Sequence, residues 1–209
     1  MGTPVPAADQ EPEALWMRRR RLVASDMEQA AVRLLAERGY ENVTTNELAD
    51  ACGVSVRTFF RYFNAKRDVL LAMPRRALTN LCDAVEARPA DESLLTAWRE
   101  VAVGGNYFDD TDVRLAADYR TIIAAEPQLL EFVNGDPELI DRFAVTTARR
   151  LGTDSDDLRA LVVGAVVRGA MIAAMSRWTS RESTELVGLF GEAFDMLEHL
   201  GSIGRPSAS

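Results

Sequence analysis

The residues best suited to chemistry in this chain are Arg57, Phe60 and Arg61, which recur three and four positions apart. That spacing places the three side chains on one face of a helix, with Thr58 and Tyr62 beside them. An arginine can donate two hydrogen bonds to a guanine, and an apolar side chain can contact the methyl group of a thymine. The pattern therefore predicts a helix whose exposed face reads base edges in a DNA major groove.

The residues before this helix predict the element that positions it. Thr44 and Glu47 have the spacing of a capping box, which begins a helix near Asn46. Gly53 lies where a helix end needs a left-handed residue, and Ser55 is a suitable N-cap for a second helix. Thr44 to Lys66 thus reads as a helix-turn-helix unit, the arrangement that places its second helix in the major groove.

The opposite face of the second helix is apolar, since Phe59 and Phe63 lie four residues apart and are expected to enter the core. An ordinary helical hairpin is the alternative, and it predicts acidic and basic residues mixed on the exposed face. Between Arg57 and Arg67 the chain carries four basic residues and no acid, which favours DNA binding. Lys66, the only lysine, is expected to contact a phosphate. The predicted DNA contacts are Thr44, Thr45, Ser55, Val56, Arg57, Thr58, Phe60, Arg61, Tyr62 and Lys66.

These motifs resemble the N-terminal domain of the TetR family of bacterial transcriptional regulators. The resemblance runs from Arg21 to about Met73 and is carried by Ala31–Tyr40, Val43–Ala49, Gly53–Phe63 and Lys66–Ala72. It implies an all-α fold, with a three-helix DNA-binding domain followed by a helical ligand-sensing and dimerisation domain. It also implies a cytoplasmic, homodimeric repressor that a small molecule releases from a palindromic operator.

The chain divides into four expected segments. Residues 1–17 form a disordered arm, 18–73 the DNA-binding domain, 74–200 the sensing and dimerisation domain, and 201–209 a flexible tail. Pro74 is expected to kink or break a helix at the boundary between the two domains. The net charge is −8 over 209 residues, yet Leu15–Asn80 carries 12 Lys and Arg against 7 Asp and Glu. The favourable field for DNA is therefore confined to the N-terminal third.

The last two predicted helices, residues 153–179 and 183–200, are unusually rich in apolar and small residues. Their apolar faces exceed what one neighbouring helix covers, which favours a homodimer through a four-helix bundle over a buried central helix. The aromatic, aliphatic and methionine residues before them suggest a cavity for a small-molecule effector. The candidate ligand contacts are Trp98, Tyr107, Phe108, Tyr119, Ile122, Ile123, Phe132, Phe143, Arg168, Met171, Met175 and Trp178.

Arg168 is the one charged residue among these candidates. Two readings remain open for it: an ion pair with Glu192 or Asp195, which we favour, or a contact with an anionic ligand headgroup. The run Arg18–Arg21 has two readings of equal weight, a phosphate- or minor-groove-binding arm or a solvated basic turn.

Other classes of function have weak support. His199 is the only histidine, and no P-loop or dinucleotide-binding motif is present, so we expect no catalytic residue and no cofactor. The acidic stretches 109–112 and 154–157 lack the glycine and glutamate of a calcium loop, so no metal is expected and helix capping is favoured. Cys52 and Cys82 suit a reducing cytosol, and no membrane span is expected because Leu158–Met175 contains two arginines. The alternatives kept are a transcriptional activator, an architectural DNA binder, and a helical carrier or enzyme.

Overall fold

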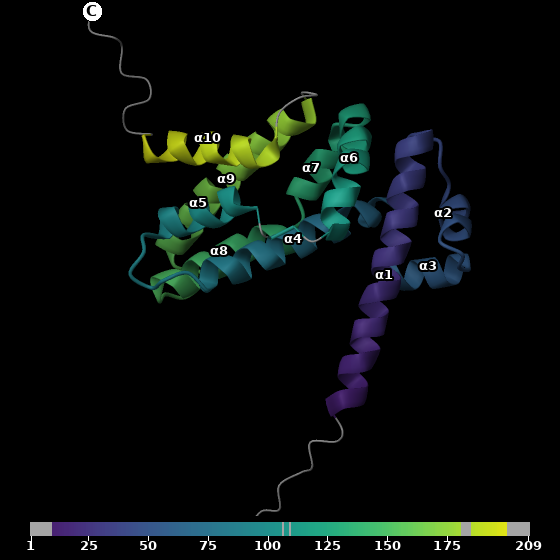
Figure 1. Cartoon of the computed structure of the whole chain (residues 1–209), viewed down its shortest axis with the longest axis horizontal. Helices are drawn as coiled ribbons and strands as arrows, with labels where there is room; N and C mark the ends of the chain where they lie inside the picture. The colour runs from purple at the N-terminus through teal and green to yellow at the C-terminus, as the bar shows by residue number, and fades with distance from the viewer. Residues whose placement is uncertain (1–9, 106, 109, 181–184, 200–209) are drawn as a thin grey trace, which may run out of the picture. The chain divides into compact units, whose positions relative to one another are not determined.

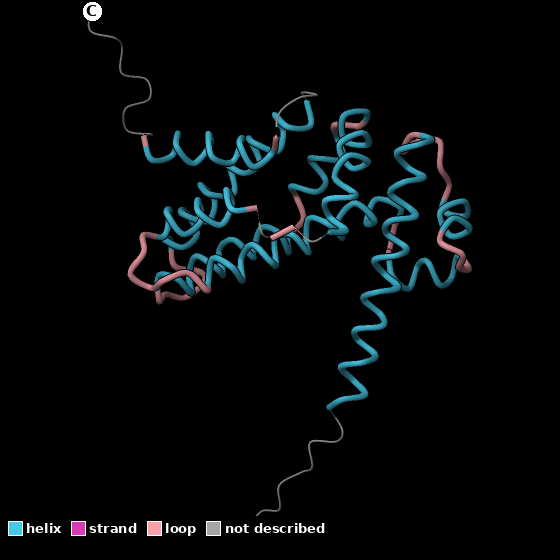
Figure 2. The backbone as a smooth tube through the Cα atoms, in the orientation of Figure 1, coloured by secondary structure: helices cyan, strands magenta, loops and turns pink. Residues whose placement is uncertain are grey.

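The structure is a computed structural model that describes residues 10–105, 107–108, 110–180 and 185–199. Within those ranges every regular element is helical, as Figure 2 shows, and the all-α expectation is confirmed. The elements, labelled in Figure 1, are α1 (Gln10–Arg38), α2 (Thr45–Ala51), α3 (Val56–Tyr62), a 3-10 turn (Lys66–Asp68), α4 (Val69–Glu86), α5 (Leu94–Gly104), α6 (Asp110–Ala125), α7 (Gln128–Asn134), α8 (Pro137–Leu151), α9 (Leu158–Ser180) and α10 (Leu186–Glu198).

The chain separates into two compact units after Val69. Of the two outcomes expected at Pro74, a kink or a break, the break is wrong, because α4 runs from Val69 to Glu86 with Pro74 inside it. Pro74 lies beyond the first turn of α4 and has no N–H to donate to the Leu70 carbonyl, and the Tyr119 hydroxyl donates to that carbonyl instead. The predicted tail, 201–209, lies outside the described residues.

The first unit contains α1, α2 and α3 around a small apolar core. Met27, Ala31 and Leu35 of α1 are buried, as the sequence pattern predicts. Helix α1 begins at Gln10, within the segment 1–17 that was expected to be a disordered arm. Leu22 of α1 is 59% exposed, because its turn extends beyond the part of the helix whose residues form the core.

The second unit is a bundle in which α9 packs against α8, α10 and α6, and α5 packs against α10. Figure 1 shows α4 alongside α8, and two ion pairs join them: Arg142 with Asp83 at 2.7 Å and Arg149 with Glu86 at 3.0 Å. Gly164 brings α9 close to α8, because a Cβ there would lie 3.2 Å from backbone atoms of Phe143 and Ala144. A larger residue at this point would therefore require the backbone of α8 to shift away from α9.

One face of α9 is apolar and exposed. By length and composition α9 meets the criteria for a membrane span, contrary to the sequence expectation, although the core helix of a soluble protein meets the same criteria. The exposed apolar positions of α9 recur at helical spacing and carry small or aliphatic side chains. They are Leu158, Leu161, Val162, Ala165, Val166, Gly169 and Ala173.

Candidate nucleic-acid interface and effector cavity

The turn between α2 and α3 is built as the sequence predicts. Glu47 completes the capping box, since its carboxylate accepts from the Thr44 backbone N–H at 2.8 Å and the Thr44 hydroxyl accepts from the Glu47 N–H at 3.3 Å. The backbone N–H and the hydroxyl of Thr44 hold the pKa of Glu47 below its usual range. Gly53 has φ +65°, the left-handed conformation that only glycine adopts cheaply, and Ser55 caps α3 by accepting from the Thr58 N–H at 3.1 Å.

The two faces of α3 are sharply different. Phe59 is fully buried and Phe63 is 5% exposed, with ring centroids 5.2 Å apart, so both anchor the helix from behind. Phe60 is 45% exposed, and Arg57 and Arg61 are exposed beside it. The three residues predicted to meet base edges thus share one solvent-facing surface, which we call the α3 recognition face.

Lys66 has partners within the protein that the sequence did not reveal. Its ammonium group donates to the carbonyl oxygens of Tyr40 at 2.7 Å and Val43 at 3.0 Å, and it lies 4.1 Å from the centroid of the Tyr40 ring. Lys66 therefore ties the connection between α1 and α2 to the end of the recognition unit. Its contact with a phosphate stays a prediction, and its visible role is structural.

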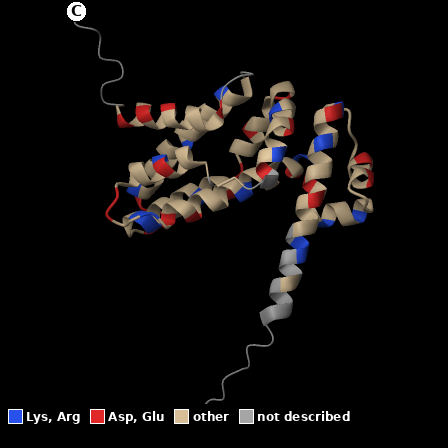
Figure 3. Cartoon of the chain, in the orientation of Figure 1, with Lys and Arg blue, Asp and Glu red and all other residues tan. Residues whose placement is uncertain are grey.

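Part of the arginine run reaches α3. The guanidinium of Arg20, on α1, lies 5.9 Å from the centroid of the Tyr62 ring, and that of Arg61 lies 5.4 Å from the same centroid. Figure 3 shows basic residues on α3, acidic ones on α2, and residues of both signs on α1. The attractive charge for a polyanion therefore lies on α3 and the arginine-containing turns of α1.

The second unit contains an apolar cavity of about 130 Å³. Helices α4, α6, α7, α8, α9 and α10 contribute its walls, together with the segment that joins α5 to α6. The lining residues are Met73, Pro74, Ala77, Leu78, Leu81, Tyr107, Phe108, Tyr119, Leu130, Val133, Asn134, Leu139, Phe143, Arg168, Met171, Ile172, Met175 and Phe190.

Several of the candidate ligand contacts from the sequence lie in this lining: Tyr107, Phe108, Tyr119, Phe143, Arg168, Met171 and Met175. Trp98 does not line it but stacks on Phe143, with ring centroids 5.3 Å apart. Ile122, Ile123, Phe132 and Trp178 also lie outside the lining.

The largest group that the sequence analysis missed comes from α4. Met73, Ala77, Leu78 and Leu81 form an apolar stripe at helical spacing, which was a signal available in the sequence. The expected kink or break at Pro74 falls within this stripe and separates Met73 from Ala77, Leu78 and Leu81.

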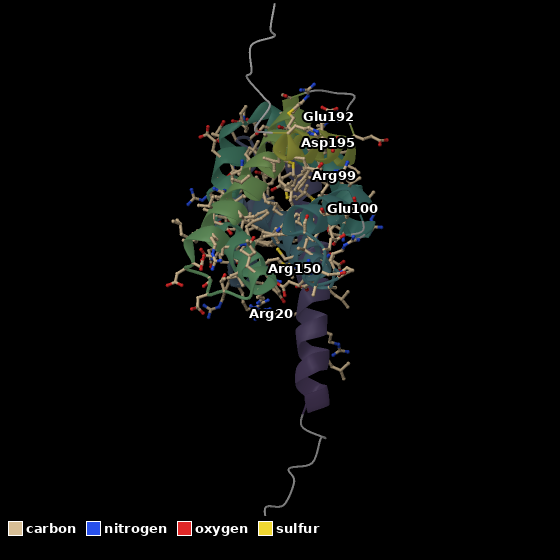
Figure 4. All side chains as sticks on the ribbon, turned by 90° about the vertical axis from the view of Figure 1, so that its left-hand side faces the viewer. Arg20, Arg99, Glu100, Arg150, Glu192 and Asp195 are labelled. Atoms are coloured by element: carbon tan, nitrogen blue, oxygen red, sulfur yellow. The ribbon has the colours of Figure 1, made fainter. Side chains whose placement is uncertain are left out.

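Arg168 does not make the ion pair that we favoured. Its Nη1 donates to the backbone carbonyl of Asn134 at 3.0 Å. Asp195 pairs instead with Arg99 of α5 at 2.8 Å, and Figure 4 labels both residues. The hydrogen bond to Asp195 raises the pKa of the Arg99 guanidinium above its usual value. This pair links α10 to α5 and leaves Arg168 out.

Polar contacts fix α4 to the helices around the cavity. Arg75 pairs with Asp136 at 2.6 Å, and Arg76 donates from Nε to the fully buried carboxylate of Asp112 at 3.0 Å. The Tyr119 hydroxyl donates to the backbone carbonyl of Leu70. Asp112 was expected only to cap a helix, and its pairing with Arg76 is a role that sequence spacing could not show.

A helix-turn-helix unit with a basic recognition face, joined to a helical unit with an apolar cavity, defines a DNA-binding transcriptional regulator. Residues 29–73 match the family described as bacterial regulatory proteins, tetR family, and residues 92–200 match the MftR C-terminal domain. The chain belongs to the TetR family of bacterial transcriptional regulators, with an MftR-like C-terminal domain. The family is one of regulators and not of enzymes, in agreement with the expectation of no catalytic site.

Two relatives match over most of the chain. The HTH-type transcriptional regulator TcmR of Streptomyces glaucescens is 30% identical over 99% of this chain and 98% of its own. The putative mycofactocin biosynthesis transcriptional regulator MftR of Mycobacterium tuberculosis (strain ATCC 25618 / H37Rv) is 27% identical over 86% of this chain and 91% of its own. The crystal structure of the TetR-family regulator PfmR from Thermus thermophilus aligns with a TM-score of 0.44 and 20% identity, over 82% of this chain and 96% of that one.

Proposed function

We propose that this regulator is a homodimeric repressor that a small apolar or amphipathic ligand releases from a palindromic operator in the bacterial cytoplasm. The observation that carries the proposal is the pairing of an exposed α3 recognition face with an apolar cavity whose wall includes α4. Helix α4 is the element that directly follows the DNA-binding unit in the chain. A ligand in the cavity therefore contacts the helix that follows that unit directly in the chain.

The DNA contacts divide by chemistry. Arg57, Phe60 and Arg61 supply the base readout, because they are exposed on one face of α3. Thr58 and Tyr62 flank that face. The DNA phosphates are contacted by residues at the N-terminal ends of α2 and α3, namely Thr44, Thr45, Ser55 and Val56. Two such units, one per subunit, suit half-sites about one helical turn apart.

The exposed apolar face of α9 supports dimerisation. Aliphatic side chains such as Leu161 and Val162 alternate there with Ala165, Gly169 and Ala173, which allow a second helix to approach closely. A continuous apolar surface of this kind is unfavourable in water unless another surface covers it. A second copy of α9, flanked by α10, matches it in length and composition, and a two-fold dimer pairs the same face with itself.

Ligand binding is expected to alter α4 because the cavity is small. A cavity of about 130 Å³ is close to the size that holds a benzene ring, whereas pockets for larger ligands usually exceed about 300 Å³. Met73, Met171 and Met175 are the adaptable side chains in the lining. A larger ligand must move such side chains and with them the wall that α4 provides, and DNA affinity falls if the ligand favours a state with a different spacing of recognition helices.

The proposal is tested in two steps. The purified chain is used to select from a randomised double-stranded oligonucleotide pool, and a two-fold symmetric consensus is expected. Reporter output from a promoter carrying that consensus should rise when the gene for this chain is deleted, and a fall would identify an activator. Failure to enrich any sequence at low ionic strength contradicts sequence-specific binding. Distances between spin labels on the two α3 helices should change when a releasing ligand binds.

A further inference from the structure

We propose that the effector carries an anionic group, and that Arg168 binds this group in the cavity, beside the Asn134 carbonyl. The inference rests on the proposed ligand-binding role of the cavity and narrows the class of ligand to anionic amphiphiles. Arg168 carries the only charge among the described residues that line the cavity.

The first step is the state of the guanidinium group. Arg168 is half-buried on α9 and donates from Nη1 to the Asn134 carbonyl. Among the residues that the structure describes, no carboxylate lies within ion-pairing distance of Arg168. Of the two partners expected from the sequence, Glu192 and Asp195, the second is paired with Arg99. The positive charge is thus held against apolar walls without a negative partner from the described part of the chain.

The second step is the cost of that arrangement. A guanidinium has five N–H donors in a planar fork, and a carbonyl at one nitrogen leaves an edge able to bind an anion through two parallel bonds. A charge withdrawn from water without a counter-charge is unfavourable, and a carboxylate beside it restores the balance. The surrounding low-polarity lining strengthens such a pair relative to the same pair in water.

The third step concerns the rest of the ligand. Tyr107, Phe108 and Phe143 provide aromatic surface, and Met171 and Met175 extend it along α9. The hydroxyl groups of Tyr107 and Tyr119 donate to the backbone carbonyls of Ala102 and Leu70, within the protein. The lining therefore offers an apolar surface with one cationic group, which fits a ligand with an apolar body and one anionic group.

A purely structural role for Arg168 is the alternative. Asn134 ends α7, and an arginine that donates to a terminal carbonyl stabilises a helix end. That role needs a hydrogen-bond donor but no net charge. Arg168→Gln removes the charge and keeps an N–H donor on a shorter side chain, so the two roles predict different ligand selectivity.

The experiment compares octanoate, 1-octanol and octylammonium, which differ only in the head group, by calorimetric titration of the full-length protein. Wild type should bind octanoate at least about tenfold more tightly than octanol, since a hydrogen bond to a charged group is worth that factor or more. Octylammonium should bind most weakly. This ranking needs no variant, so it tests the proposal even if Arg168→Gln does not fold.

The variants then locate the effect. Arg168→Gln should bring the affinities for octanoate and octanol to within about twofold, by weakening octanoate alone. Arg177→Gln, an exposed position on the same helix and outside the cavity lining, should keep the wild-type ratio. Equal binding of the two probes to wild type, no binding of either, or an unchanged ratio in Arg168→Gln overturns the inference. Octanoate binding that depends on Arg168 but leaves operator binding unchanged would instead refute release by ligand and leave the anion site standing.

Discussion

The hydroxyl of Tyr119, on α6, donates to the backbone carbonyl of Leu70, in the first turn of α4. In an uninterrupted helix that carbonyl accepts from the N–H four residues later, but the residue there is Pro74, which has no N–H. Tyr119 thus replaces the donor that the proline removes. Because Tyr119 and Pro74 both line the cavity, the bond joins the proposed effector site to the first turn of the helix that follows the DNA-binding unit.

Tyr119→Phe should lower the free energy of unfolding by about 1–3 kcal/mol, because it leaves a buried carbonyl without a donor. In a Pro74→Ala background the backbone N–H of the introduced alanine can serve Leu70, so the same change should cost clearly less. Urea unfolding of the two single variants and the double variant gives the coupling energy directly. Tyr107→Phe is the matched control, because the Tyr107 hydroxyl donates to the Ala102 carbonyl at 3.3 Å and not to Leu70. Its effect on the free energy of unfolding is expected to add to that of Pro74→Ala. Additivity of Tyr119→Phe with Pro74→Ala would refute the replacement.

Two neighbouring phenylalanines on α3 separate stability from recognition. Phe59 is fully buried, so Phe59→Ala should destabilise the DNA-binding unit by about 3–5 kcal/mol. Phe60 is 45% exposed, so Phe60→Ala should change stability by less than about 1 kcal/mol and weaken operator binding. Thermal unfolding and fluorescence anisotropy on the selected operator measure the two effects. If the Phe60→Ala protein binds the operator with wild-type affinity, Phe60 does not contribute to recognition.

Substitutions of Arg57 and Lys66 should differ in their effect on stability as well as on DNA binding. Arg57→Ala should cost about 1–3 kcal/mol of operator affinity and relax specificity at one base position. Lys66→Ala removes a donor from the Tyr40 and Val43 carbonyls, so it should lower stability by about 1–3 kcal/mol as well as reduce DNA affinity. Arg67→Ala, at an exposed neighbour, serves as the control for loss of one positive charge. Salt-dependent binding isotherms and unfolding curves are the measurements, and an unchanged stability of Lys66→Ala would contradict the structural role.

The sequence was sufficient for the DNA-binding unit because its signals are local. The capping box at Thr44, the left-handed Gly53 and the buried spacing of Phe59 with Phe63 each depend on residues within a few positions of one another. The contacts of Lys66 within the protein could not be predicted in this way, because its partners Val43 and Tyr40 lie 23 and 26 residues away in the sequence.

The cavity was only partly predictable for the same reason. Aromatic and methionine side chains marked the correct region, but spacing along α6 to α9 could not distinguish Tyr119, which lines the cavity, from Ile122 or Trp178, which do not. Arg76 pairs with Asp112, which lies 36 residues away in the sequence, and Arg168 donates to the Asn134 carbonyl. Both contacts depend on how the helices pack against one another, which spacing along the sequence does not show. A kink or break at Pro74 was expected because the sequence does not show that Tyr119, from another helix, donates the hydrogen bond that the proline cannot make.

Cys52 should be protected from alkylation in the folded protein. Burial raises the pKa of the Cys52 thiol from 9.0 to about 11, and its Sγ donates to the Met27 carbonyl at 3.3 Å. At pH 8 the folded protein then holds about one hundredth of the thiolate of the unfolded chain. Because the folded pKa is the higher one, the stabilisation is complete below pH 9 and is lost as the pH rises towards 11. Iodoacetamide labelling of a Cys82→Ala variant, followed by mass spectrometry, should show slow reaction at pH 8 and rapid reaction in urea; equal rates would contradict the burial.

The exposed face of α9 provides the test of self-association. Val166 is 42% exposed there, so Val166→Glu should leave the helical content of the subunit intact and place a charge in the proposed dimer interface. Two charges would then face one another across the two-fold axis without partners, and the dimer should dissociate. Val113→Glu, at a 66% exposed position on α6, makes the same chemical change away from α9 and should remain dimeric. Sedimentation velocity measures the mass, and operator affinity should fall in Val166→Glu alone, because one subunit reaches only one half-site. A dimeric Val166→Glu protein, or dissociation of both variants, would show that subunits do not meet through this face.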